Sequence, residues 1–107
     1  MSDSLTPLCK TSEVAENSVI QVTPPDQPPV AVYNLGGEFF ATAGYCTHAE
    51  AALCDGHIED GTIECPWHAA RFNIRTGKAL DFPATVDIET YRVEIEGDQV
   101  LAHLNTT

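Results

Sequence analysis

Apolar and polar residues alternate with a period of two along much of the chain, whereas helical spacing of apolar residues is hard to find. In the clearest segment, 91–96, Tyr91, Val93 and Ile95 share one face and charged residues occupy the other. This alternation predicts a half-buried strand. Other short segments rich in β-branched and aromatic residues predict further strands at 19–22, 30–35, 38–42, 62–64 and 100–104.

Glycine-containing dipeptides punctuate these segments and supply the positive φ angles that tight turns need. They are Gly36-Gly37, Asp60-Gly61, Thr76-Gly77 and Gly97-Asp98. One short helical turn is expected at 13–16, after Ser12. The pattern as a whole predicts an all-β domain of short antiparallel strands, arranged as a sandwich or barrel.

The composition of the chain excludes several classes of binding partner. The chain has 107 residues, of which 43% are hydrophobic, so one compact domain is expected. Asp and Glu number 16 against 5 Lys and Arg, and a net charge of -11 disfavours nucleic acid and anionic membranes as partners. Apolar runs are far shorter than the roughly 20 residues that cross a bilayer. The N-terminus lacks the pattern of a secretory signal, so we expect a cytoplasmic protein.

Four cysteines raise the question of disulfides or metal ligation. Disulfides would suit a secreted domain, but a reducing cytoplasm keeps thiols free, which favours ligation for at least some of them. Two Cys-His pairs stand out, Cys46-Thr47-His48 and Cys65-Pro66-Trp67-His68, separated by sixteen residues. Each pair fits on a single loop, and a hairpin around Asp60-Gly61 would place the two loops side by side. Two thiolates and two imidazoles suit a transition metal or an iron–sulfur cluster.

The spacing within the pairs distinguishes these two possibilities. A zinc ion could take all four side chains, but the Cys-x-His spacing is tighter than that of usual zinc sites. In a binuclear iron cluster each loop can give its cysteine to one iron and its histidine to the other, so the spacing favours the cluster. Cys9 and Cys54 have no partner at ligand spacing and are expected to be packed, free thiols. For His57 and His103 we expect ordinary surface or half-buried roles.

The two Cys-His pairs resemble the paired signatures of Rieske proteins, and similar context runs from about residue 33 to 100. The resemblance implies a Rieske-like antiparallel β-sandwich with an inserted two-loop cluster-binding subdomain. The single domain, 1–107, would then consist of a base, 1–43 and 84–107, and the subdomain, about 44–83. The resemblance also implies one 2Fe-2S cluster, with two Cys and two His ligands: Cys46, His48, Cys65 and His68.

Two departures from respiratory Rieske proteins affect the expected chemistry. Those relatives carry an extra cysteine in each loop that forms a disulfide, whereas the candidate positions here are Ala51 and Trp67. They also have a serine and a tyrosine that donate hydrogen bonds to the cluster sulfurs, whereas the matching positions here are Ala70 and Phe72. Without these donors, in a strongly acidic protein, the potential is expected toward the low end of the Rieske range, about -150 mV.

Length and acidity narrow the resemblance to the soluble Rieske ferredoxins of bacterial aromatic-ring-hydroxylating dioxygenases. The implied function is electron transfer, one electron at a time, from a flavin-containing NAD(P)H-dependent ferredoxin reductase to a terminal Rieske oxygenase. The protein would not be catalytic alone, and we expect a monomer because a shuttle must release each partner in turn. The alternatives are a small Rieske-like subunit of an NADH-dependent nitrite reductase and a structural zinc module.

The resemblance also suggests how the protein would contact its partners. His48 and His68 would lie at an exposed tip and form the exit for the electron. Glu50 and Asp55 would be rim charges that steer toward basic patches on the partners. Four further side chains would shield the cluster from water: Pro66, Trp67, Phe82 and Pro83.

Overall fold

The computed structural model describes residues 5–25, 27–45, 51–66, 70–80 and 87–104. Within these residues the chain forms short strands and two 3-10 helices, in agreement with the predicted all-β fold. The elements, in chain order, are β1 (Leu5–Lys10), η1 (Thr11–Glu13), β2 (Ser18–Val22), β3 (Val30–Leu35), β4 (Glu38–Ala43), η2 (Leu53–Asp55), β5 (His57–Glu59), β6 (Thr62–Glu64), β7 (Arg71–Asn73), β8 (Thr90–Tyr91), β9 (Val93–Glu96) and β10 (Gln99–His103).

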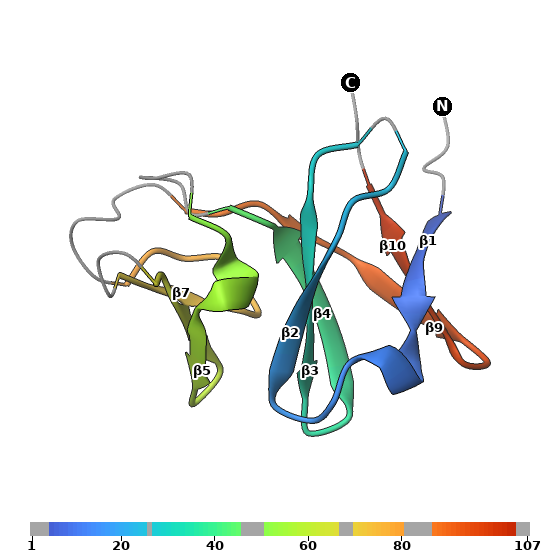
Figure 1. Cartoon of the computed structure of the whole chain (residues 1–107), viewed down its shortest axis with the longest axis horizontal. Helices are drawn as coiled ribbons and strands as arrows, with labels where there is room; N and C mark the ends of the chain where they lie inside the picture. The colour runs from blue at the N-terminus through green and yellow to red at the C-terminus, as the bar shows by residue number, and fades with distance from the viewer. Residues whose placement is uncertain (1–4, 26, 46–50, 67–69, 81–86, 105–107) are drawn as a thin grey trace.

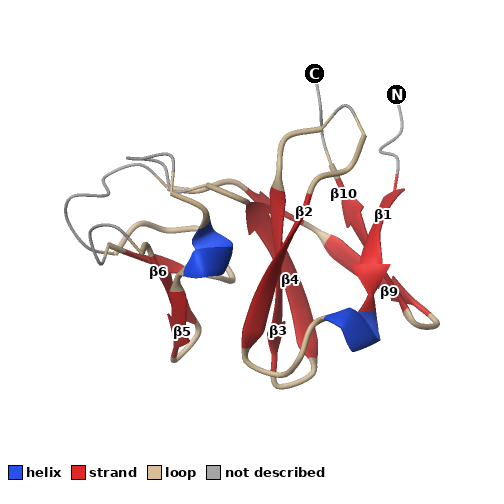
Figure 2. Cartoon of the chain, in the orientation of Figure 1, coloured by secondary structure: helices blue, strands red, loops and turns tan. Residues whose placement is uncertain are grey.

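The strands form three antiparallel sheets, with the orders β1-β10-β9, β2-β3-β4-β8 and β5-β6-β7. Figures 1 and 2 show the β2-β3-β4-β8 sheet in the middle, with the other two sheets on either side. Strand β4 pairs directly with β8, through Ala41 with Tyr91 and Thr42 with Thr90. The long segment that contains the β5-β6-β7 sheet is therefore inserted between two paired strands.

Strand β3 supports both neighbouring layers. Its residues from Val30 to Asn34 are all buried, because alternate side chains enter different cores. Val30 and Val32 pack in a core with residues of β1 and β10. Ala31 and Tyr33 pack in a second core with Leu53 and Cys65 of the inserted segment. The continuous apolar run at the start of β3 is thus a consequence of burial on both faces.

Two predicted hairpins are confirmed, with their glycines in the left-handed region. In the loop between β5 and β6, Asp60 has φ 51° and Gly61 has φ 76°. In the loop between β3 and β4, Gly36 has φ 64° and Gly37 has φ 100°. Two consecutive positive φ angles give a turn whose twist matches that of paired strands.

The prediction of one strand over 91–96 was wrong. The chain forms β8 and β9 on either side of Arg92, and the two strands belong to different sheets. Ile95 was expected to be buried but is 46% exposed. It lies opposite Val100 on the core side, but β9 is the edge of its sheet and leaves Ile95 partly uncovered.

The helical turn predicted at 13–16 lies earlier in the chain, as η1. Its position follows from a local hydrogen bond, since the Lys10 N–H donates to Glu13 Oε1 at 2.7 Å. Glu13 therefore caps the start of the turn instead of beginning it. The chain then reverses at Asn17, which has φ 58°.

A carboxylate–imidazole pair joins the last two strands and provides a test of acid stability. His103 Nε2 lies 2.8 Å from Glu94 Oε2, and this contact holds the pKa of Glu94 below its ordinary value. A carboxyl whose pKa is lowered by folding stabilises the folded state above its unfolded pKa of 4.5, and this contribution is lost as the pH falls through the folded pKa. The free energy of unfolding of Glu94→Gln should therefore fall less than that of the wild type between about pH 5 and pH 3.

Urea denaturation at several pH values would measure this difference. Glu96→Gln, which removes a carboxylate from the same strand, serves as the control and should keep the wild-type pH dependence. Equal acid dependence of the wild type and Glu94→Gln would show that the pair does not contribute.

Candidate metal centre

One of the four predicted ligands, Cys65, lies in the described part of the chain. Cys65 directly follows β6 and is 1% exposed. Its backbone N–H donates to the carbonyl of Ala70 at 2.7 Å, which closes the base of the loop between them. Cys46, His48 and His68 lie outside the described residues, so their assignment as ligands stays a prediction.

The base of the other predicted loop is also closed by backbone contacts. Tyr45 forms an isolated antiparallel bridge with Ala52. One residue further on, the Leu53 N–H donates to the carbonyl of Gly44 at 2.8 Å. Tyr45 and Ala52, which lie on either side of the Cys-x-His segment in the sequence, are therefore joined, and η2 begins at the next residue.

The segment that follows the first loop base contacts the start of the second loop base at Gly56. A Cβ atom on Gly56 would overlap the carbonyl oxygen of Glu64, so the chain after the first loop passes against the residue that precedes Cys65. The φ of Gly56 is -89°, an ordinary value, so close approach is the reason for glycine here. The predicted hairpin over 57–64 is confirmed, and the loop segments 46–50 and 67–69 themselves lie outside the described residues.

The same apolar core lies under both loop bases. Ala51 and Leu53 come from the end of the first loop, and Cys65, Ala70 and Phe72 come from around the second. All five are at most 2% exposed. Ala70 and Phe72 have no side-chain hydrogen-bond donor, so the described side chains that share this core with Cys65 are apolar.

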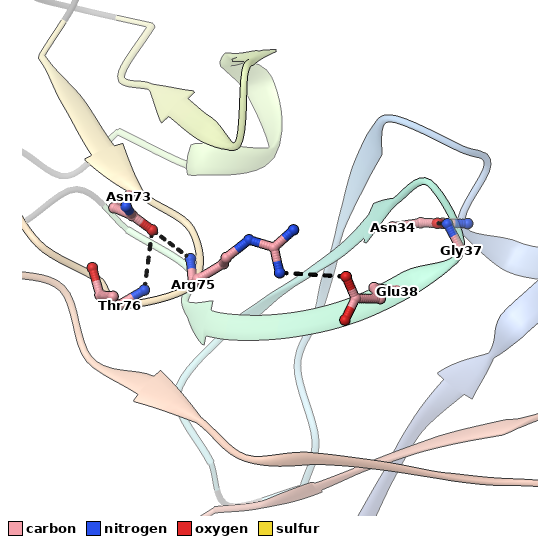
Figure 3. A network of polar contacts seen from close by, with 6 residues as sticks. All are labelled: Asn34, Gly37, Glu38, Asn73, Arg75 and Thr76. Atoms are coloured by element: carbon pink, nitrogen blue, oxygen red, sulfur yellow. Dashed lines mark hydrogen bonds and ion pairs between the residues drawn. The ribbon is translucent and has the colours of Figure 1, made fainter.

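The turn after β7 connects this region to the central sheet. Asn73 Oδ1 accepts the N–H groups of Arg75 at 2.9 Å and Thr76 at 3.2 Å (Figure 3). The turn presents the Arg75 guanidinium to β4, 3.4 Å from Glu38 Oε1 and 4.8 Å from the centroid of the Phe40 ring. These contacts position the inserted segment against β4.

The remaining cysteines and histidines agree with their predicted roles. Cys9 in β1 and Cys54 in η2 are half-buried free thiols. Burial raises the pKa of both thiols, and the neighbouring carboxylates Glu13 and Asp55 raise them further. His57 is exposed at the start of β5, and His103 forms the pair with Glu94.

The predicted Cys-His ligands suit an iron–sulfur group, whereas the isolated cysteines Cys9 and Cys54 do not. Cys65 supplies a buried thiol at the base of one predicted loop, and the segment that follows the base of the Cys-x-His loop lies against the neighbouring Glu64 at Gly56. Soft thiolate and imidazole donors of this kind suit iron–sulfur ligation. Among the expected shielding residues, Pro66 is exposed, and Trp67, Phe82 and Pro83 lie outside the described residues.

Two contributions to the site were not identified from sequence. Gly56 was not assigned a role, although a glycine next to a predicted loop base is a signal of close backbone approach. The bridge between Tyr45 and Ala52 joins single residues outside any strand, and no alternating pattern marks it. In the described ranges no helix is long and apolar enough to cross a membrane.

The all-β fold and the two Cys-His loop sequences are typical of a Rieske iron–sulfur protein, and the family comparison gives the same result. The Rieske [2Fe-2S] domain matches residues 4–92, so this chain belongs to the Rieske [2Fe-2S] family. Within the family it is similar to ferredoxin components of dioxygenases. It is 43% identical to the ferredoxin component of biphenyl 2,3-dioxygenase from Rhodococcus jostii, over 94% of each chain. It is 40% identical to the 3-phenylpropionate/cinnamic acid dioxygenase ferredoxin subunit of Escherichia coli, over 90% of each chain.

Solved structures support the same placement. A ferredoxin from Sphingomonas yanoikuyae B1 superposes with a TM-score of 0.90 at 38% identity, covering 95% of this chain and all of that chain. The predicted Rieske-like fold and the resemblance to dioxygenase ferredoxins are therefore confirmed. A nitrite reductase small subunit from Mycobacterium tuberculosis has a TM-score of 0.87 at 18% identity, which shows a shared fold alone.

Proposed function

We propose that this protein is the electron-carrying ferredoxin of an aromatic-ring dioxygenase system. It would accept one electron at a time from a flavin-containing NAD(P)H-dependent reductase and deliver it to a terminal Rieske oxygenase. The observation that carries the proposal is the meeting of two closed loop bases over one buried core beside Cys65. Similarity to dioxygenase ferredoxin components along 94% of the chain supports the same role.

The proposed ligands are Cys46, His48, Cys65 and His68, which would hold one 2Fe-2S cluster. When bound, the cluster supplies a reversible one-electron couple. Residues 44–83 would form the cluster-binding subdomain, and 1–43 with 84–107 the base. Around Cys65, the described side chains exclude water: Leu53, Ala70 and Phe72 are fully buried.

A terminal oxygenase is the partner with the most direct support. The chain is 31% identical to a ferredoxin solved in complex with the oxygenase of carbazole 1,9a-dioxygenase, with a TM-score of 0.88 and coverage of 95% of this chain. We further propose that the protein is a cytoplasmic monomer that catalyses no reaction alone. A small reversible interface suits a carrier that must bind two partners in succession.

Electron stoichiometry and spectroscopy would test the proposed function. Oxidation of NADH to NAD+ releases two electrons, so with catalytic reductase one NADH should reduce two molecules of this protein. The reduced protein should show the rhombic low-temperature EPR signal of mixed thiolate and imidazole ligation, with a low average g. A colourless protein that contains zinc, or one that NADH and a dioxygenase reductase do not reduce, would exclude the proposal.

The potential depends on hydrogen bonds near Cys65. Ala70, whose carbonyl accepts the Cys65 N–H, is fully buried, and Ala70→Ser would place a hydroxyl beside the ligand. One new hydrogen bond that favours the reduced state by about 1 kcal/mol raises a one-electron potential by roughly 40 mV. Protein-film voltammetry would measure it. Ala31→Ser makes the same change in the same core, away from the loops, and should leave the potential unchanged; equal shifts would contradict a local hydrogen bond.

Surface charge near the loops is expected to guide reduction. Asp55 is exposed in η2, close to the first loop, and Glu50 lies in that loop. Asp55→Lys should slow reduction by the reductase several-fold at low salt and weaken its salt dependence, because acidic rim charges steer association with a basic partner. Stopped-flow reduction at several ionic strengths would measure both effects.

Asp98→Lys is the matched control for this prediction. Asp98 is exposed in the turn between β9 and β10. Figure 1 shows strand β9 on the opposite side of the molecule from β5. Asp98→Lys changes the net charge of the protein by the same amount as Asp55→Lys. Equal slowing in the two variants would mean that total charge, and not the position of Asp55, sets the rate.

A further inference from the structure

A groove of about 360 Å³ lies where the chain passes from β8 to β9. One side is β4, which contributes Phe39 and Phe40, and another is the crossing itself, with Tyr91 and Arg92. The turn after β7 adds Arg75. The groove exists because β8 stays with β4 while β9 joins a different sheet, so the two layers separate at this point. It is distinct from the loop bases around Cys65.

The charge of this groove differs from that of the rest of the chain. Two of the five basic residues of the protein, Arg75 and Arg92, line it, and none of its described lining residues is acidic. The whole chain carries 16 Asp and Glu and a net charge of -11, which repels anions from most of the surface. A negatively charged ligand would therefore find favourable charge here.

Both arginines retain donors for such a ligand. Arg75 Nη1 lies 3.4 Å from Glu38 Oε1 (Figure 3), and the guanidinium lies over the Phe40 ring. Arg92 Nη2 lies 3.6 Å from Glu94 Oε2, and that oxygen is closer to His103 Nε2, at 2.8 Å. Exposed ion pairs of this kind are weak, and a guanidinium has five N–H donors. A bound carboxylate can thus use the remaining donors or replace a weak pair.

We propose that this groove binds a monocyclic aromatic carboxylate, with its ring against Phe39 and Tyr91, which share one core, and its carboxylate on Arg92 and Arg75. Aromatic walls stack favourably with a planar ring, and arginine recognises carboxylates through paired N–H groups. The volume lies near the lower end of small-molecule sites, roughly 300–1,000 Å³, and fits one ring with a short acidic group. The ligand would contact both the central sheet and the inserted segment.

Titration of the oxidised holoprotein with benzoate, followed by backbone amide shifts of groove residues, would test this proposal. Benzamide retains the ring without the charge, and acetate retains the charge without the ring. We expect saturable benzoate binding, with at least about tenfold weaker binding of benzamide and acetate. Arg92→Gln should weaken benzoate binding about tenfold or more, as expected for the loss of a charged hydrogen bond.

Lys10→Gln is the control, since it removes one positive charge from β1, outside the groove, and should change benzoate affinity less than about twofold. Absence of saturation by about 20 mM benzoate, equal binding of acetate, or an equal effect of Lys10→Gln would each overturn the proposal. So would binding of an acidic peptide at the groove when benzoate does not bind. These readouts do not involve electron transfer, so the groove and the proposed function are tested independently.

Discussion

Purified Cys65→Ala is expected to be colourless and to contain little iron or acid-labile sulfide. Cys65 is the described member of the proposed ligand set, and its buried thiol lies at the base of a closed loop. Alanine removes the thiolate and leaves no donor at that position, so the cluster should not assemble. Iron and sulfide assays, visible absorption and EPR of the reduced protein would measure the loss.

The other cysteines provide matched controls for this prediction. Cys9→Ala and Cys54→Ala remove half-buried thiols that are outside the proposed ligand set, and both variants should retain the full visible spectrum. Cys46→Ala, His48→Ala and His68→Ala should behave like Cys65→Ala. Full iron content in Cys65→Ala, or loss of the cluster in Cys54→Ala, would show that the ligand assignment is wrong.

Gly56→Ala is expected to reduce the free energy of unfolding by at least about 3 kcal/mol, because its Cβ would overlap the carbonyl oxygen of Glu64. The obstacle is a backbone atom of a paired strand, which cannot rotate away as a flexible side chain could. Relief of the overlap must move the two loop bases apart, so cluster content should fall as well. Chemical denaturation followed by circular dichroism, together with iron analysis, would measure both effects.

Gly61→Ala separates steric overlap from the general cost of replacing glycine. Gly61 has φ 76°, but no heavy atom lies within 4 Å of a Cβ built there. Its substitution should cost about 1–2 kcal/mol, from the left-handed backbone alone, and leave the cluster intact. If the two variants lose equal stability, close packing between Gly56 and Glu64 is not what holds the loops together.

Local chemistry made several parts of the fold predictable. The strands at 30–35 and 62–64 were predicted with the bounds that the structure shows, and the Asp60-Gly61 dipeptide identified its hairpin. These features depend on residues within a few positions of one another. The split of 91–96 at Arg92 was not predicted. Alternation shows which residues lie on the same face of a strand, but it does not show which sheet that strand joins.

The candidate site divides in the same way. The spacing of the Cys-His pairs predicted the ligand chemistry, and the structure adds that Cys65 is buried at the base of its loop. Gly56 was not identified as the point of contact, because the space beside a glycine depends on what packs there. Its role required the position of Glu64, on the neighbouring strand.

By itself, the sequence determined the all-β class, the main hairpins, the acidic surface and the Rieske-type Cys-His pairs, since these depend on residue type and short spacing. Tertiary structure alone decided that β3 is buried on both faces and that the loop bases meet at Gly56. It also decided that Phe40, Arg75 and Arg92 line one groove. Each of these results depends on how separate sheets pack together, and such packing joins segments that are distant along the chain.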